Sequence, residues 1–169
     1  MKLSVVLATF NEEKNIDQCL QSVKGLADEI VVMDGFSSDR TRAIALSYKA
    51  HVTKIKNQPN NFHSMKQAAI DKAKGEWILQ LDADEFLSDE LKSEIVSTIN
   101  KKNNRFDGYA IKRKNWFLGK FLTKGGAYPD PVVRLFKKGK GHFLYQEMIK
   151  NGITTANVHA QIKIDGKVG

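Results

Sequence analysis

The sequence contains a single cysteine, Cys19, so an intramolecular disulfide is excluded. Cys19 shares an apolar helical pattern with Ile16, Leu20 and Val23, which predicts a buried hydrophobic position rather than a nucleophile. A lone, buried thiol suits a reducing compartment, so we expect a cytoplasmic protein.

Long apolar runs are also missing, and none approaches the roughly 18 residues of a transmembrane helix. The short run at residues 3–8 is followed by Asn11, Glu12 and Glu13 without a small-residue cleavage site. We interpret this run as a first strand rather than a signal peptide, with Asn11 as the N-cap of the helix that follows.

Glycine is absent from the turn after this first strand, where a dinucleotide-binding Rossmann domain has a glycine-rich loop. The chain also has no Gly-x-x-x-x-Gly-Lys-Ser/Thr sequence, which excludes a P-loop. If the ligand is a nucleoside diphosphate, its charge must therefore be neutralised by a carboxylate-bound cation rather than by backbone amides.

An acidic cluster follows the apolar residues 77–81 and is the most informative segment. Asp82, Asp84 and Glu85 place three carboxylates within four residues, and their mutual repulsion calls for a positive partner. Mg²⁺ and Mn²⁺ prefer oxygen ligands and are often held by one or two carboxylates plus substrate phosphates. The alternative is a solvated acidic loop in which Glu85 starts a helix.

The first hundred residues alternate between strand and helix signals. Strands are predicted at residues 3–8, 30–33, 51–55 and 77–81, with a helix after each. This order predicts an α/β fold, a mostly parallel sheet flanked by helices, whose strand ends bring polar residues to one edge. Shorter strand signals at 109–112, 132–136 and 162–164 predict a smaller, irregular or antiparallel C-terminal part. We expect one domain over residues 1–169.

Charge is distributed unevenly between the two parts of the chain. Residues 1–100 carry 12 Lys/Arg and 15 Asp/Glu, whereas residues 101–140 carry 12 Lys/Arg and 2 Asp. The basic segment would face an anionic membrane or a phosphorylated acceptor, or would simply form a basic surface. Nucleic acid is not expected as a partner, because no binding module with aromatic stacking positions is evident.

Several motifs together resemble a known family. Residues 4–13, 34–41 and 75–85 resemble, in order, the signatures of family-2 glycosyltransferases with the GT-A (Rossmann-like) fold. Residues 115–120, 128–130 and 134–136 resemble the subgroup that adds glucose or a related sugar to the inner core of bacterial lipopolysaccharide or lipooligosaccharide. The match is looser from 137 to 169, and we interpret the chain as a truncated or naturally minimal catalytic domain.

The resemblance implies an inverting, metal-dependent transfer from a nucleotide sugar, usually a UDP-hexose, to a saccharide or glycolipid acceptor in cell-envelope synthesis. Mn²⁺ or Mg²⁺ would be the cofactor. Residues 1–100 would form the nucleotide-sugar half, and residues 101–169 the basic acceptor-side half, in peripheral contact with the anionic inner membrane.

The resemblance also assigns residues to the site. Those that would line the nucleotide pocket are Thr9, Phe10, Asn11 and Glu12. Asp34 would bind the base, Lys66 would lie near the base or phosphate, and Asp82 would lie near the ribose. Asp84 would ligate the cation, which makes Asp82 and Asp84 the expected catalytic pair. In the purely structural alternatives, Thr9 and Asn11 serve a turn and a cap, Asp34 ends a strand, and Lys66 is only solvated.

One position departs from the family pattern. Relatives commonly have His-Glu where this chain has His159-Ala160, and alanine cannot accept the proton of the acceptor hydroxyl. Three explanations stay open: the alignment slips across 139–157, Glu147 or Asp130 serves as the base, or the chain is impaired. The alternatives to a transferase are a non-catalytic sugar-nucleotide-binding domain and a sugar-phosphate nucleotidyltransferase.

Overall fold

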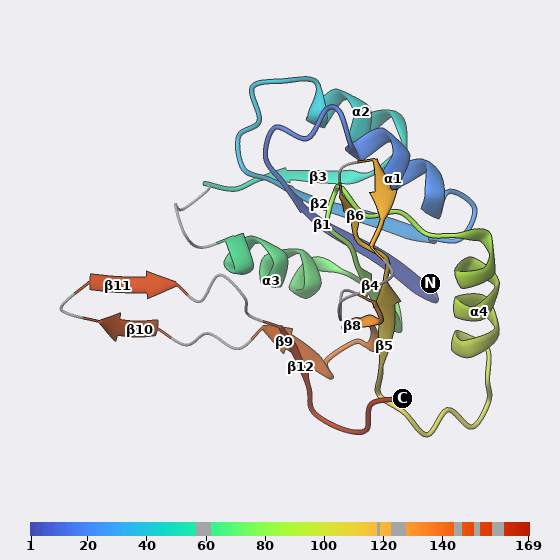
Figure 1. Ribbon diagram of the computed structural model, residues 1–169. Helices are drawn as coiled ribbons and strands as arrows, with labels where there is room; N and C mark the ends of the chain where they lie inside the picture. The colour runs from blue at the N-terminus through green and yellow to red at the C-terminus, as the bar shows by residue number, and fades with distance from the viewer. Residues whose placement is uncertain (57–61, 118, 123–127, 144–146, 151–152, 157–160) are drawn as a thin grey trace.

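A computed structural model describes residues 1–56, 62–117, 119–122, 128–143, 147–150, 153–156 and 161–169. Within these residues, six strands form the central sheet in the order β3-β2-β1-β4-β8-β5 (Figure 1). The parallel strands are β1 (Leu3–Thr9), β2 (Glu29–Asp34), β3 (His51–Lys54) and β4 (Trp77–Gln80). β8 (Asp130–Lys137) runs antiparallel between β4 and β5 (Gly108–Arg113). The predicted mostly parallel sheet is therefore confirmed.

Helices cover both faces of this sheet (Figure 1). They are α1 (Ile16–Val23), α2 (Thr41–Ser47), α3 (Phe62–Lys72) and α4 (Asp89–Ile99). Val5 and Leu7 of β1 pack in one core cluster with residues of α1, α2 and α4, whereas Val6 and Ala8 pack in another with residues of α3. Every residue of β1 is buried, as expected for a central strand covered on both faces.

The C-terminal part is built from short antiparallel pairs, as the sequence predicted. They are β6 (Trp116–Phe117) with β7 (Lys120–Phe121), β9 (Gly141–Phe143) with β12 (Ile162–Ile164), and β10 (Glu147–Lys150) with β11 (Ile153–Ala156). The C-terminal part also supplies β5 and β8, which extend the sheet begun by β1–β4. These two strands lie beside the acidic loop, the segment after β4 that contains Asp82, Asp84 and Glu85. Among the described residues, no helix has both the length and the apolar character needed to cross a membrane.

The helix starts agree with the sequence in part. Ser88 caps α4, because its side chain accepts a hydrogen bond from the Leu91 backbone. The prediction that Asn11 caps the first helix is wrong, since α1 begins at Ile16. Asn11 has a left-handed backbone, with a φ of 54°, and its side chain bonds to the loop before α2 instead.

Candidate active site

The expected site residues lie at the C-terminal edge of the parallel strands. Thr9 and Asp34 are register partners at the ends of β1 and β2. β4 ends at Gln80, and Asp82 follows two residues later. Parallel pairing therefore brings these polar side chains to one edge, where open α/β sheets bind ligands.

Backbone-to-side-chain hydrogen bonds join the loop after β1 to the loop after β2. The Asn11 backbone donates to Ser37 Oγ at 2.9 Å, and the Ser38 backbone donates to Asn11 Oδ1 at 2.9 Å. The Glu12 backbone donates to Thr41 Oγ1 at 2.7 Å. These bonds fix the segment that the sequence assigned to the nucleotide pocket, while Phe10 stays exposed on it.

Asp34 is fully buried, although it carries a carboxylate. Its Oδ2 accepts a hydrogen bond from the Ser37 backbone at 3.1 Å and lies 3.9 Å from Arg42 Nε. Among the described residues, neither Asp34 Oδ1 nor the nearby Thr9 Oγ1 has a hydrogen-bond partner. Buried polar atoms without partners are costly, so each needs an explanation such as a missing ligand donor.

Asp82 lies between two cations that come from separate elements. Lys66 of α3 forms an ion pair with Asp82 Oδ1, and Arg134 Nη2 of β8 lies 3.0 Å from Asp82 Oδ2. Burial would raise the pKa of Asp82, but the charges of Lys66 and Arg134 outweigh it and lower that pKa. Asp82 is therefore held as an anion. The alternative in which Lys66 is merely solvated is wrong, because Lys66 is buried in this ion pair.

Arg134 extends the network to the rest of the acidic loop. Its guanidinium also contacts Gln80 Oε1 of β4 and lies 2.5 Å from Glu85 Oε1. Glu85 in turn accepts a hydrogen bond from the Asp82 backbone at 3.0 Å. Glu85 therefore closes a turn rather than starting a helix, and α4 begins only at Asp89.

A second arginine connects Glu85 to Asp130, one of the two residues named as a substitute base. Arg113 Nη1 lies 3.4 Å from Glu85 Oε1, and Arg113 Nη2 lies 2.7 Å from Asp130 Oδ2. Hydrogen bonds from Arg113 and Asn115 lower the pKa of Asp130. A carboxylate with a lowered pKa is a weaker base, so this geometry disfavours Asp130 as the proton acceptor.

Asp84 contrasts with its neighbours in the acidic loop. It is exposed, and it makes no hydrogen bond or ion pair with any part of the chain that the structure describes. No group of three or more His, Cys, Asp or Glu side chains is placed to hold a metal within the described residues. The site therefore offers one uncommitted carboxylate, which fits a cation that takes its other ligands from substrate and water.

Neither arginine stands out as a site residue in the sequence. Arg134 lies in the subgroup motif at 134–136, and Arg113 lies in the basic segment at 101–140. Their partners in the acidic loop are 28 to 52 residues away along the chain, so no local spacing reveals the pairs. The available signal was an arginine inside the strand predicted at 132–136. His159 and Ala160 lie outside the described residues, as does the side chain of Glu147.

The reactivity of the buried Cys19 thiol tests whether the acidic loop shields it from solvent. Cys19 Sγ donates to the Asp82 carbonyl at 3.6 Å, and burial, followed by the charges of Glu85, Asp82 and Asp84, raises its pKa to about 12. At about pH 8 we expect alkylation by iodoacetamide to be more than about a hundredfold slower than for a free thiol. In denaturant the same thiol should react normally, and fast reaction of the native protein would contradict a closed loop.

The family follows from comparison with known proteins. Residues 4–156 match the family described as Glycosyl transferase family 2, so the chain belongs to that family. The lipopolysaccharide core biosynthesis glycosyltransferase LpsC of Rhizobium meliloti is 26% identical over 156 residues, which cover 90% of this chain and 57% of LpsC. The chain spans about half the length of the curated relatives it matches.

Solved structures agree with the fold. S. aureus TarS 1–349 in complex with UDP-GlcNAc has a TM-score of 0.60 and 26% identity, over 73% of this chain and 37% of that one. The Pyrobaculum calidifontis mannosyltransferase PcManGT, solved with GDP-Man and Mn²⁺, has a TM-score of 0.53 and 20% identity, over 66% of this chain and 36% of that one. These neighbours are GT-A glycosyltransferases, which confirms the predicted fold class.

Proposed function

We propose that this chain carries the donor site of a metal-dependent, inverting glycosyltransferase that uses a nucleotide sugar, in the first instance a UDP-hexose. The acceptor is a saccharide or glycolipid of the bacterial cell envelope. The observation that carries the proposal is the difference between the surroundings of Asp82 and those of Asp84 in the acidic loop. Asp82 is paired with Lys66 and Arg134, whereas Asp84 is exposed and has no partner among the residues that the structure describes.

This difference favours Asp84 as the cation ligand. Asp82 would have to exchange its two cationic partners for a metal ion. Asp84 would lose no partner among the described residues by binding one. Mn²⁺ or Mg²⁺ bound there would supply the positive charge that stabilises a departing diphosphate. The family membership and the sugar-nucleotide complex of TarS support a nucleotide-sugar donor.

The base of the nucleotide would bind at the ends of β1 and β2. Asp34 Oδ1 lacks a donor among the described residues, and the imide N–H of a uracil is a donor of the right kind. Thr9 Oγ1, in the same part of the molecule, is a second buried atom for which the described residues supply no partner. Because Asp34 is fully covered, the base would reach it only after neighbouring side chains move.

The arginine pairs favour a second candidate function. Glu85 and Asp130 are both paired with Arg113, so neither is an uncommitted base for the acceptor hydroxyl. Together with Ala160, this supports a domain that binds a sugar nucleotide without turning it over. The two candidates share the donor site and differ only in catalysis.

A thermal-shift screen with a parallel turnover assay tests both candidates. At about 100 times Kd, a nucleotide that binds only the folded state adds about 2.7 kcal/mol, which corresponds to roughly 5–10 °C for a chain of this size. We expect UDP and UDP-sugars to give such a shift with Mn²⁺, and a much smaller one with EDTA. Inorganic pyrophosphate with Mn²⁺ is the control for binding without the base.

The outcomes separate the candidates. Shift with release of UDP from a UDP-sugar supports the transferase, and shift without release supports the binding domain. No shift with any sugar nucleotide would reject the donor site, and an equal shift in EDTA would reject the metal.

A further inference from the structure

We propose that the β6–β7 hairpin docks on an anionic lipid bilayer, with Trp116 and Phe121 inserted among the headgroups. The docking itself is independent of the donor chemistry. Its purpose rests on the proposed function, because a glycolipid acceptor would be held in the same membrane.

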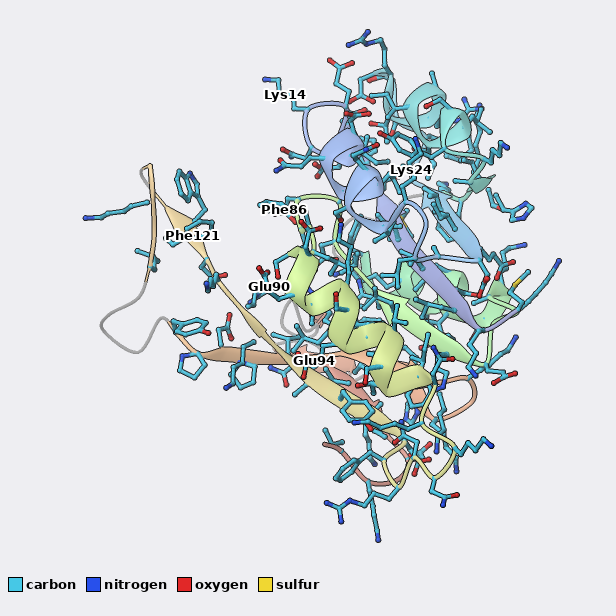
Figure 2. All side chains as sticks on the ribbon, turned by 90° about the vertical axis from the view of Figure 1, so that its right-hand side faces the viewer. Lys14, Lys24, Phe86, Glu90, Glu94 and Phe121 are labelled. Carbon is cyan, nitrogen blue, oxygen red and sulfur yellow. The ribbon has the colours of Figure 1, made fainter. Side chains whose placement is uncertain are left out.

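The hairpin presents apolar side chains to solvent. Trp116 and Phe121 are register partners with ring centroids 4.7 Å apart, and they are 61% and 46% exposed. Among the described residues, no other strand pairs with β6 or β7. Figure 2 shows the hairpin that carries Phe121 standing out from the helices of the molecule. Two exposed aromatic rings in contact form a continuous apolar surface, and such surface is a candidate interaction site.

Lysines flank these aromatic residues along the chain. Lys112, Lys114 and Lys120 are exposed, and none of them forms an ion pair within the described part of the chain. Cationic side chains attract an anionic bilayer over about a Debye length, ~8 Å at physiological salt. Tryptophan is enriched at the membrane–water interface, where an apolar ring and a polar N–H both find partners.

Three other cations of the basic segment have partners elsewhere in the chain. Arg113 is paired with Glu85 and Asp130, Lys137 is paired with Asp107, and Lys138 donates to the Ala73 carbonyl. Lys137 also lies at the opposite end of β8 from the hairpin, roughly 20–25 Å away at the usual rise per strand residue. Of these described cations, we therefore assign Lys112, Lys114 and Lys120 to the membrane-facing surface.

The two aromatic rings form one apolar unit. The planes of Trp116 and Phe121 meet at 78°, so the edge of one ring packs against the other. The charge of the three lysines selects an anionic surface.

The hairpin also lies beside the donor site. It follows Arg113, which ends β5 and contacts Glu85 of the acidic loop. A docked hairpin would therefore hold the site edge next to the bilayer, within reach of the sugar headgroup of a membrane-bound acceptor.

Vesicle binding with three variants tests the proposal, using phosphatidylglycerol–phosphatidylcholine vesicles and pure phosphatidylcholine as reference. We expect Trp116→Ser/Phe121→Ser and Lys112→Gln/Lys114→Gln/Lys120→Gln each to lower the partition coefficient for anionic vesicles about tenfold or more. The control Lys101→Gln/Lys102→Gln/Lys140→Gln removes the same charge elsewhere in the basic segment and should change it by less than about twofold. Equal losses in the control would overturn the proposal.

Fluorescence reports insertion directly. The chain has two tryptophans, and Trp77 is buried in the core, so Trp77→Phe leaves Trp116 as the only tryptophan, which is excited selectively over the tyrosines at long wavelength. Anionic vesicles should shift its emission to the blue, and an unchanged spectrum would overturn the proposal, as would self-association that the hairpin variants abolish. The UDP-induced thermal shift with Mn²⁺ should survive in all hairpin variants, so failure of docking and failure of the donor site are distinguishable.

Discussion

Replacing Asp84 with Asn is expected to lower Mn²⁺-dependent turnover of a UDP-sugar by roughly a hundredfold or more, because the loop then has no uncommitted anionic ligand. Asp82 would not substitute, since Lys66 and Arg134 already neutralise it. Asp84 is exposed and makes no hydrogen bond within the described residues, so its substitution should leave the melting temperature nearly unchanged. Initial rates over a Mn²⁺ titration measure the effect.

Asp89→Asn is the matched control. Asp89 is the next aspartate along the chain, its side chain is 91% exposed, and it pairs only with Lys92 within α4. The variant has the same change of charge a few residues away and should keep full turnover. Unchanged turnover in Asp84→Asn, or an equal loss in both variants, would reject Asp84 as the cation ligand.

Arg134→Met is expected to produce the largest loss of stability. Arg134 is buried and contacts three acceptors, namely Gln80, Asp82 and Glu85. Breaking a buried ionic network by removing one partner leaves charge uncompensated, at about 3 kcal/mol here, or roughly 6–12 °C in melting temperature. Thermal unfolding monitored by circular dichroism measures the loss.

Two further variants identify the cause. Lys137→Gln removes a charge from the same strand, but its partly exposed pair with Asp107 is screened by water and should contribute much less. Adding Glu85→Gln to Arg134→Met removes one of the stranded carboxylates, so part of the loss should be recovered. If Lys137→Gln costs as much as Arg134→Met, the network around Arg134 is not what stabilises the loop.

The same variant should change the response to acid. The lowered pKa of Asp82 means that its contribution to stability is present above its unfolded value of about 3.9 and is lost as pH falls through the lower folded value. Without Arg134, burial is opposed by Lys66 alone, and the pKa of Asp82 rises. Acid unfolding of Arg134→Met should therefore begin at a higher pH than that of the unaltered chain.

Local patterns predicted the parts of the fold that local physics decides. The apolar runs at 3–8, 30–33 and 77–81 correspond to β1, β2 and β4. The parallel order then placed Thr9, Asp34 and Asp82 at one edge without any knowledge of side-chain contacts.

Tertiary contacts decided what the sequence missed. Asn11 precedes two glutamates, as an N-cap residue often does, but hydrogen bonds to Ser37 and Ser38 hold its backbone in the left-handed region. The pairing of Arg134 with Asp82 depends on β8 lying against β4, which no spacing along the chain specifies. Buried charge pairs between strands that are far apart in the sequence can therefore be predicted only once the strand order of the sheet is known.

Asp84 is the one carboxylate of the acidic loop that has no partner among the described residues, and this bears on the order in which metal and donor bind. One aspartate alone binds a hydrated divalent ion weakly, because other oxygens must complete the coordination shell. Ion and diphosphate would therefore strengthen each other's binding by the same factor, as linkage requires. Such a protein would take up its metal chiefly together with its donor, and would release both once the transferred sugar is gone.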